Sequence, residues 1–370
     1  MQIDQPLRKT RNFPYPYQVR IRGAGKVFST HSNDLSDLDF QQQLLERVSR
    51  SFAFTIPQLP GALRSVVTNA YLLCRVADTI EDENALTIDQ KRRFFGKLVA
   101  IVSGNASPVE FASELLPMLS GDTWPAERDL IRNLHRIIRI TRGFNEKERE
   151  GLKRCLTLMC AGMELFQELK SPQGLRSSSD FNDYCYYVAG VVGELLTQLF
   201  CDYSAEISNR RAALKNLAVS FGQGLQMTNI LKDLWKDQDR GVCWLPQDVF
   251  KKMGYDLAGL SRECYHHGFG RGLSELIAIA HRHLKNALAY TLLLPRSEKG
   301  LRKFCLWAIG MAIFTLQKIN GKKHFGTSEE VKISSRNVRG IILATHLTVR
   351  SNVLLKILFS LSARGLPTCP

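Results

Sequence analysis

The chain has 370 residues, 44% hydrophobic and 23% charged, enough for one large globular domain or two ordinary ones. This composition is neither disordered nor collagenous. The formal net charge of +15 favours an anionic partner, such as nucleic acid, an anionic membrane or a phosphorylated small molecule, or else a solvated basic surface. Because no run of five like charges occurs, we expect no nucleic-acid partner.

Cysteine usage and hydropathy indicate the cellular compartment of the protein. Its nine cysteines are odd in number and lie mostly in apolar helical patterns, so we expect reduced, buried thiols. The N-terminus has no apolar signal core. The longest uncharged run, residues 304–317, is shorter than the roughly 20 residues of a membrane span. We expect a cytoplasmic protein, with peripheral contact at the cytoplasmic face of a membrane as an added expectation.

In chain order, a basic segment (residues 1–34) comes first and contains one stretch, YQVRIRG, that alternates as a short strand would. Residues 35–365 then form the predicted domain. Stretches without proline and with apolar residues three or four apart predict long helices: 134–144, 152–166, 187–200, 217–235 and 303–319. Pro and Gly mark breaks at 56–61, 103–110, 120–127, 170–174, 237–248 and 293–300. We predict one all-α domain.

Two predicted helices end in paired acids. Asp78 and Asp82 follow an apolar run, and Asp233 and Asp237 follow another. Residues four apart lie on one helix face, where two bare carboxylates repel by about 0.2–0.5 kcal/mol. Mg²⁺ prefers oxygen ligands and typically takes one or two carboxylates together with substrate phosphates. Two such helices facing each other would hold Mg²⁺, with a diphosphate bridging the ions.

The alternative interpretation is that each acidic pair lies on an ordinary helix face exposed to solvent. One acidic pair on a helix is common, and Glu146 and Glu150 share the spacing in a stretch that is typical of plain surface. Two pairs, each at the end of an apolar helix, favour the metal site.

Cations and aromatic residues surround the acids in sequence. Arg75, Lys232 and Arg240 lie within a helical turn of them and could clamp a leaving diphosphate, although a salt bridge to a neighbouring acid is the simpler interpretation of each. Aromatic side chains pack cores in most cases, but their faces also stabilise a carbocation in a site without water. The aromatic residues near the acids are Phe52, Phe54, Tyr71, Tyr184, Tyr186, Tyr187, Phe304 and Trp307.

Four segments together resemble the squalene and phytoene synthases, which join prenyl diphosphates head to head. They are VSRSFAFTI, YLLCRVADTIED, YCYYVAGVVGELLTQLF and LQMTNILKDLWKDQDRG with the later WLPQDVF. The resemblance runs from about Tyr17 to about Arg339. It implies a single-domain isoprenoid (prenyl) synthase fold with helices around a central cavity, long prenyl diphosphate substrates and Mg²⁺.

The resemblance also implies roles for individual residues. Asp78, Asp82, Asp233, Asp237 and Asn229 would bind the metal ions. Ser49, Arg50, Ser51, Arg75, Gln226, Asn229, Lys232 and Arg240 would bind diphosphate. Tyr184, Tyr71, Arg75, Phe52 and Phe304 would act at the reaction centre, with Tyr184 at the position proposed for proton handling or cation stabilisation.

Two departures from the pattern concern the cations. Lys232 stands where squalene synthases usually carry Arg, so bidentate phosphate contact is lost there. Val242 stands where Arg would be expected, with Arg240 nearby.

Several details are closer to the squalene synthase branch, among them VADTIED and KFCLWAIGMAIFTL. That branch condenses two farnesyl diphosphates to presqualene diphosphate and reduces it with NADPH to squalene, which downstream enzymes use. No Rossmann glycine motif occurs, and squalene synthases lack one too. VKISSR (331–336) resembles the segment thought to approach NADPH, through Lys332 and Arg336. A synthase of presqualene diphosphate, dehydrosqualene or phytoene without the reductive step stays an alternative.

A helical protein that binds nucleic acid or membrane without catalysis is a further alternative, but it needs no paired acids. The stretch NVLLKILFSL (352–361) predicts a last helix packed on the core, or else a surface that touches membrane. The membrane anchor of eukaryotic squalene synthases is missing from it, which indicates a bacterial-type enzyme or a shortened chain.

Overall fold

A computed structural model describes residues 35–369. Within that range the chain is helical, with no β-strand and only two isolated bridges, Ser171 to Cys243 and Leu175 to Pro246. The predicted all-α fold is therefore confirmed. The YQVRIRG stretch and the rest of the predicted N-terminal segment lie outside the described residues, so that division of the chain stays a prediction.

The helices follow one another with short connections. They are α1 (Asp37–Val48), α2 (Phe52–Thr55), η1 (Ile56–Gln58), α3 (Gly61–Asp82), α4 (Ile88–Val102), α5 (Pro108–Leu115), η2 (Leu116–Met118), α6 (Pro125–Arg132), α7 (Leu134–Gly143), α8 (Glu146–Leu169), α9 (Ser178–Cys185), η3 (Tyr186–Gly190), α10 (Val191–Tyr203), α11 (Ala205–Ser208), α12 (Arg211–Asp239), α13 (Gln247–Lys252), η4 (Leu257–Gly259), α14 (His267–Leu293), α15 (Lys299–Gly321), α16 (Ser335–Thr348) and α17 (Asn352–Ser362).

The predicted breaks at Pro and Gly coincide with helix ends, for example between α4 and α5 and between α14 and α15. Several connections contain neither Pro nor Gly, among them the one between α10 and α12. The chain leaves α10 at Tyr203 and enters α12 at Arg211 through the single turn α11. The side chain of Ser204 accepts a hydrogen bond from the backbone N–H of Ile207 and so caps that turn.

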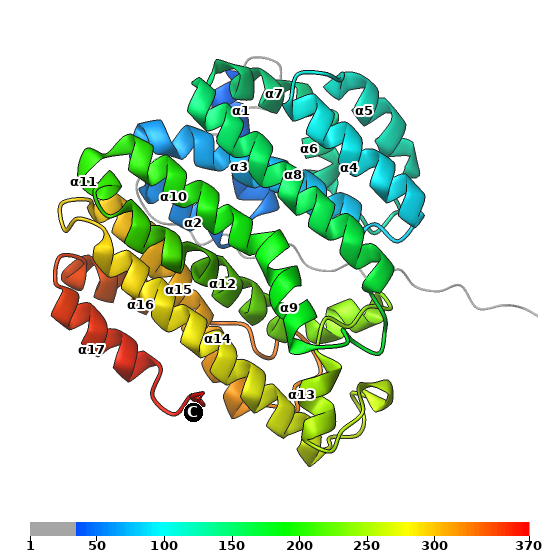
Figure 1. The fold of residues 1–370 in the computed structure, drawn as a ribbon, viewed down its shortest axis with the longest axis vertical. Coiled ribbons are helices and arrows are strands. Elements are labelled where there is room, and N and C mark those ends of the chain that lie inside the picture. The colour runs from blue at the N-terminus through cyan, green and yellow to red at the C-terminus, as the bar shows by residue number, and fades with distance from the viewer. Residues whose placement is uncertain (1–34, 370) are drawn as a thin grey trace, which may run out of the picture. The chain divides into compact units, whose positions relative to one another are not determined.

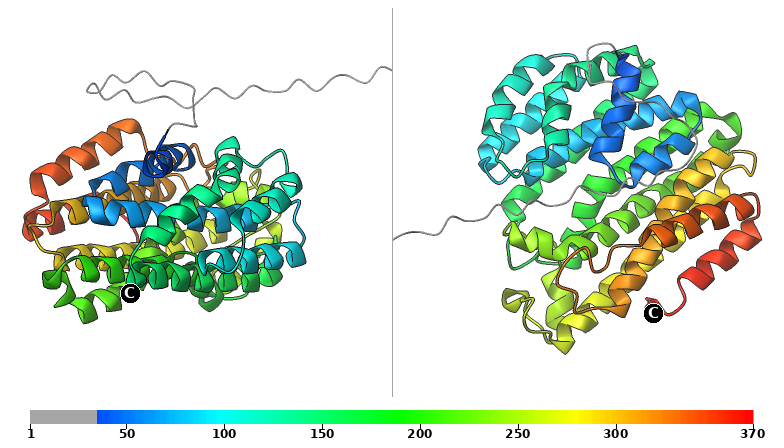
Figure 2. Two further views of the ribbon diagram at one scale, coloured as in Figure 1. Left: turned by 90° about the horizontal axis from the view of Figure 1, so that it is seen from above. Right: turned by 180° about the vertical axis from the view of Figure 1, so that it is seen from behind.

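Helix α12 is the central element of the described unit. It packs against α10, α14 and α15, while α3 contacts α8 and α10 (Figure 1). Helices α4 to α7 gather beside α3 and α8, and α16 and α17 lie at the edge, against α15 (Figure 2). A continuous hydrophobic core joins residues from α1 to α15. Opposing helices therefore frame the space between α3 and α12.

Two glycines bring one wall of that space together. A Cβ at Gly193 in α10 would lie 2.1 Å from the carbonyl oxygen of Ala218 in α12. A Cβ at Gly222 in α12 would lie 2.1 Å from the carbonyl oxygen of Ala189 in η3. Real Cβ atoms do not come so close, so both positions require glycine for backbone-to-backbone packing. The short segment η3 is a π-helical turn, a feature frequent at functional sites.

Candidate active site

A cavity of about 660 Å³ lies among α3, α10, α12 and α15. Along both α3 and α12, the lining residues change from apolar to acidic toward the C-terminal end. The guanidinium Nη1 of Arg240, just after α12, lies 2.8 Å from Oδ2 of Asp82, the last residue of α3. The two acidic ends therefore meet at one end of the cavity, which we call the mouth. The opposite, apolar end we call the interior.

Four carboxylates stand at the mouth: Asp78 and Asp82 from α3, and Asp233 and Asp237 from α12. Burial and the neighbouring Asp82 and Asp233 raise the pKa of Asp237 to about 7. Burial also raises the pKa of Asp78 to about 6, with Asp82 adding to it, although the nearby Arg75 opposes the shift. The protein alone therefore disfavours the charged forms of both carboxylates, and a cation bound beside them would favour those forms.

The Asp78 side chain keeps 40% of its accessible area because it faces the cavity, while protein atoms surround it on the other sides. Within residues 35–369, no three His, Cys, Asp or Glu side chains are gathered closely enough to hold a metal ion by themselves. Mg²⁺ does not need such a cage, because it usually completes its shell with water and substrate phosphates. The carboxylate oxygens at the mouth fit Mg²⁺ in this mode.

The predicted cations line the same mouth, each beside an acid. Arg75 lies 2.8 Å from a carboxylate oxygen of Glu127 and 3.6 Å from one of Asp78. The ammonium of Lys232 lies 3.1 Å from Asp233. These pairs agree with the simpler salt-bridge interpretation, yet each cation also borders the cavity. An incoming diphosphate could therefore replace the carboxylate as partner.

Other predicted substrate contacts also border the cavity: Ser49, Arg50, Ser51, Gln226 and Asn229. The Ser49 hydroxyl accepts a hydrogen bond from the backbone N–H of Phe52 at 2.9 Å, which fixes the turn into α2. The Arg50 side chain lies 3.9 Å from Glu329 and faces the Trp124 ring at 6.0 Å. The loop before α2 therefore contributes a polar edge to the cavity.

The interior is aromatic. The Tyr184 ring stacks on Trp244 at 3.9 Å with an interplanar angle of 10°. Phe52 meets Tyr71 at 5.2 Å, and Phe304 meets Phe200 edge-on at 6.3 Å. All six residues line the cavity. Such ring faces can stabilise a carbocation where water is excluded.

A buried polar pair joins the aromatic interior to the acidic mouth. The hydroxyl of Tyr184 lies 3.4 Å from a carboxylate oxygen of Glu81. Burial raises the pKa of Tyr184 well above its usual value, and the nearby Glu81 adds to the shift. Burial, with Asp82 and Asp78, also raises the pKa of Glu81. Both groups therefore favour their protonated forms.

The structure does not place Lys332 and Arg336 on the cavity wall. Both are exposed. The ammonium of Lys332 lies 2.8 Å from Glu329, which does border the cavity. Arg336 lies in the first turn of α16.

Sequence reasoning missed several lining residues, namely Glu81, Trp124, Trp244, Tyr290 and Glu329. Glu81 could have been found, since it precedes Asp82 in the acidic helix. Trp244 and Tyr290 carry no local signal, because only tertiary packing brings them to the cavity.

Comparisons with known proteins agree with this geometry. The family model described as Squalene/phytoene synthase matches residues 45–337. The squalene synthase of Schizosaccharomyces pombe is 28% identical over 316 residues, which are 81% of this chain and 65% of that protein. The chain thus spans less than two thirds of that relative.

Two solved structures share the fold. A complex of TcSQS with the ligand BPH1237 matches with a TM-score of 0.68 and 24% identity, over 88% of this chain and 91% of that one. A dehydrosqualene synthase with ligand matches with a TM-score of 0.61 and 19% identity, over 85% of this chain and 97% of that one.

The family model covers both acidic helices and the aromatic interior. The chain therefore belongs to the squalene/phytoene synthase family, transferases that join prenyl diphosphates head to head and typically use Mg²⁺.

Proposed function

We propose that the protein is a squalene synthase. It would condense two farnesyl diphosphates to presqualene diphosphate and then reduce this intermediate with NADPH to squalene. One observation supports the condensation above all: a single cavity combines a mouth lined by acids and cations with an interior lined by aromatic rings. The squalene synthases among the relatives support the choice of farnesyl diphosphate.

In this proposal the mouth receives the diphosphate and the interior receives the prenyl chains. Arg75, Lys232 and Arg240 bind the diphosphate oxygens and hold the first substrate with its allylic C–O bond toward the interior. Asp78, Asp82, Asp233 and Asp237, with Asn229, would hold Mg²⁺, which supplies charge neutralisation for the departing diphosphate.

Breaking the C–O bond releases diphosphate and leaves an allylic cation. The faces of Phe52 and Tyr71 stabilise this cation and exclude water that would quench it. The 2,3-double bond of the second farnesyl diphosphate attacks the cation, and loss of one proton closes the cyclopropane ring of presqualene diphosphate. We assign the released diphosphate as the final acceptor of this proton. The hydroxyl of Tyr184, with Glu81 behind it, relays the proton, taking it up as it passes its own on.

A second candidate ends without reduction, at presqualene diphosphate, dehydrosqualene or phytoene. The position of Lys332 and Arg336 outside the cavity wall favours it, as does the likeness to a dehydrosqualene synthase. We therefore derive no hydride step from these two residues.

Product analysis tests the proposal. Purified protein is incubated with farnesyl diphosphate and Mg²⁺, with and without NADPH, and the lipids are identified by mass spectrometry. A parallel reaction contains geranylgeranyl diphosphate. Squalene formed only with NADPH supports the proposal. Presqualene diphosphate or dehydrosqualene under both conditions, or phytoene from the longer substrate, supports the second candidate.

A further inference from the structure

Helices α16 and α17 present an apolar surface that nothing in the described structure covers. Leu343 and Leu347, four residues apart on α16, keep 63% and 76% of their accessible area. On α17 the exposed large hydrophobic residues are Val353, Leu354, Ile357 and Leu361. The opposite side of α17 packs inward through Leu355. We call these six exposed side chains the apolar face.

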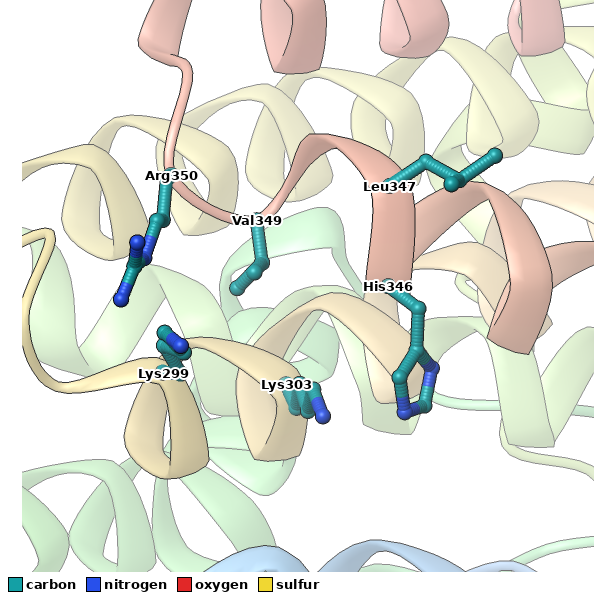
Figure 3. A pocket seen from close by; sticks show the side chains of 6 residues that line it. All are labelled: Lys299, Lys303, His346, Leu347, Val349 and Arg350. Atoms are coloured by element: carbon teal, nitrogen blue, oxygen red, sulfur yellow. The ribbon is translucent and has the colours of Figure 1, made fainter.

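A cationic pocket adjoins the apolar face. Its volume is about 330 Å³, and its lining includes Lys299 and Lys303 from α15, His346 from α16 and Arg350 from the α16–α17 connection. Figure 3 shows the Arg350 side chain above Lys299, with His346 beside Lys303. Leu347 belongs to both the pocket and the apolar face, so the two features are continuous.

The positive charge here is uncompensated. Among the described residues, none of Lys299, Lys303 and Arg350 has a carboxylate within ion-pair distance, and neither does the buried Arg302 between the two lysines. Two nitrogens of the Arg302 guanidinium have no hydrogen-bond partner in that part of the chain. Residues 331–370 contain six Lys and Arg and no Asp or Glu.

We propose that the apolar face and the cationic pocket together dock the protein on an anionic phospholipid bilayer. The exposed aliphatic side chains would enter the boundary between headgroups and acyl chains, and the pocket would take a lipid phosphate. Apolar insertion and attraction to anionic lipid together give stable peripheral binding, which neither gives alone. In residues 35–369, no helix is both long and apolar enough to cross a bilayer.

This docking does not depend on the identity of the reaction product. Helix α15 separates the active-site cavity from the cationic pocket. Its residues Phe304, Cys305 and Ala308 line the cavity, while Lys299 and Lys303 line the pocket. A docked membrane would thus lie one helix away from the apolar interior. The mouth residues take no part in the docking.

Flotation of the full chain with vesicles tests the proposal. One set of vesicles contains phosphatidylcholine alone, and the other also contains phosphatidylglycerol, whose anionic headgroups give the surface a negative potential. The pocket variant carries Lys299→Gln, Lys303→Gln and Arg350→Gln. Its control, with the same charge change on α7 and α8, carries Arg142→Gln, Lys147→Gln and Lys153→Gln. The apolar-face variant is Leu343→Ser with Leu347→Ser, and its control is Leu38→Ser with Leu165→Ser at other exposed leucines.

We expect the wild type to float with the anionic vesicles only, and less so at high salt. The pocket variant should bind at least about tenfold more weakly, because each cation near an anionic surface contributes about fivefold. The apolar-face variant should also lose binding, and both controls should keep it. Turnover of detergent-dispersed farnesyl diphosphate should be equal in all five proteins, which shows that each is folded and separates this proposal from the proposed reaction.

Three results would overturn the proposal. One is no flotation of the wild type. Another is equal loss in the variants and their controls, which would indicate a general charge effect. A third is a wild-type dimer that the apolar-face variant converts to monomer without any change in flotation, which would assign the face to a second copy of the chain.

Discussion

The mouth and the interior of the cavity are built on opposite principles. The mouth gathers Asp78, Asp82, Asp233 and Asp237, where burial raises the pKa of Asp237 to about 7 and the neighbouring Asp82 and Asp233 add to the shift. The interior packs aromatic rings in ordinary stacked and edge-on contacts. The charged groups of the mouth are therefore available to bind a charged substrate, whereas the rings of the interior pack against one another without any substrate. The difference indicates that substitutions at the mouth should affect activity more than stability.

The largest expected effect comes from Asp237→Asn. Removal of one carboxylate weakens the metal site that we propose, and electrostatic groups of this kind contribute about a hundredfold to a thousandfold each. We expect turnover to fall by at least about a hundredfold in a steady-state assay at saturating Mg²⁺. The matched control is Asp239→Asn, two residues further along α12, where the carboxylate pairs with Arg262 outside the cavity. Equal losses in both variants would contradict the assignment of the mouth.

A smaller loss is expected at the junction of mouth and interior. Tyr184→Phe keeps the stacked ring and removes the hydroxyl near Glu81. We expect turnover about a hundredfold lower, at the low end of what proton transfer contributes, with a nearly unchanged melting temperature. Tyr255→Phe, whose hydroxyl donates to the Gly259 carbonyl away from the cavity, is the control. A wild-type rate in Tyr184→Phe would remove this hydroxyl from the mechanism.

Lys232 should affect substrate affinity more than the chemical step. Lys232→Ala removes one cation from the mouth, and we expect KM for farnesyl diphosphate to rise about tenfold, as for loss of a charged hydrogen bond. Lys232→Arg should restore or improve the affinity, because a guanidinium binds phosphate bidentately. Lys215→Ala, on the exposed side of the same helix, should leave KM unchanged. An unaltered KM in Lys232→Ala would show that diphosphate binds elsewhere.

The smallest effect concerns stability without metal. The pKa of Asp237 lies at about 7, above its ordinary value of 3.8. The folded state therefore holds this proton more tightly, and the resulting stabilisation is full below pH 3.8 and lost as the pH rises through about 7. At pH 8 with chelator, Asp237→Asn should melt a few degrees higher than wild type. Added Mg²⁺ with diphosphate should remove this difference in melting temperature. A lower melting temperature in the variant at pH 8 would contradict the unfavourable burial of the Asp237 carboxylate.

Much of the fold could be predicted because helix periodicity and breaks are local. Pro and Gly marked most helix ends, while the turn at 204–210 carried neither. The four-residue spacing of the acids placed each pair on one helix face. That both pairs meet at one mouth, linked by Arg240 and Asp82, depends on tertiary packing.

The other unpredicted features have the same origin. The stacking of Tyr184 on Trp244 joins residues sixty positions apart, and the π-helical turn η3 has no sequence signature that we could use. The basic pocket joins α15 to the connection after α16, so a reading of charge along the chain could not reveal it.

The role of the acidic mouth is tested by the release of inorganic diphosphate from farnesyl diphosphate as Mg²⁺ is titrated. We expect no release in chelator and a rise with Mg²⁺ that is nearly lost in Asp237→Asn and retained in Asp239→Asn. Without NADPH, one diphosphate should appear for every two substrates consumed. Release that persists in chelator, or that is equal in the two variants, would contradict the claim that the acidic mouth drives departure of the diphosphate.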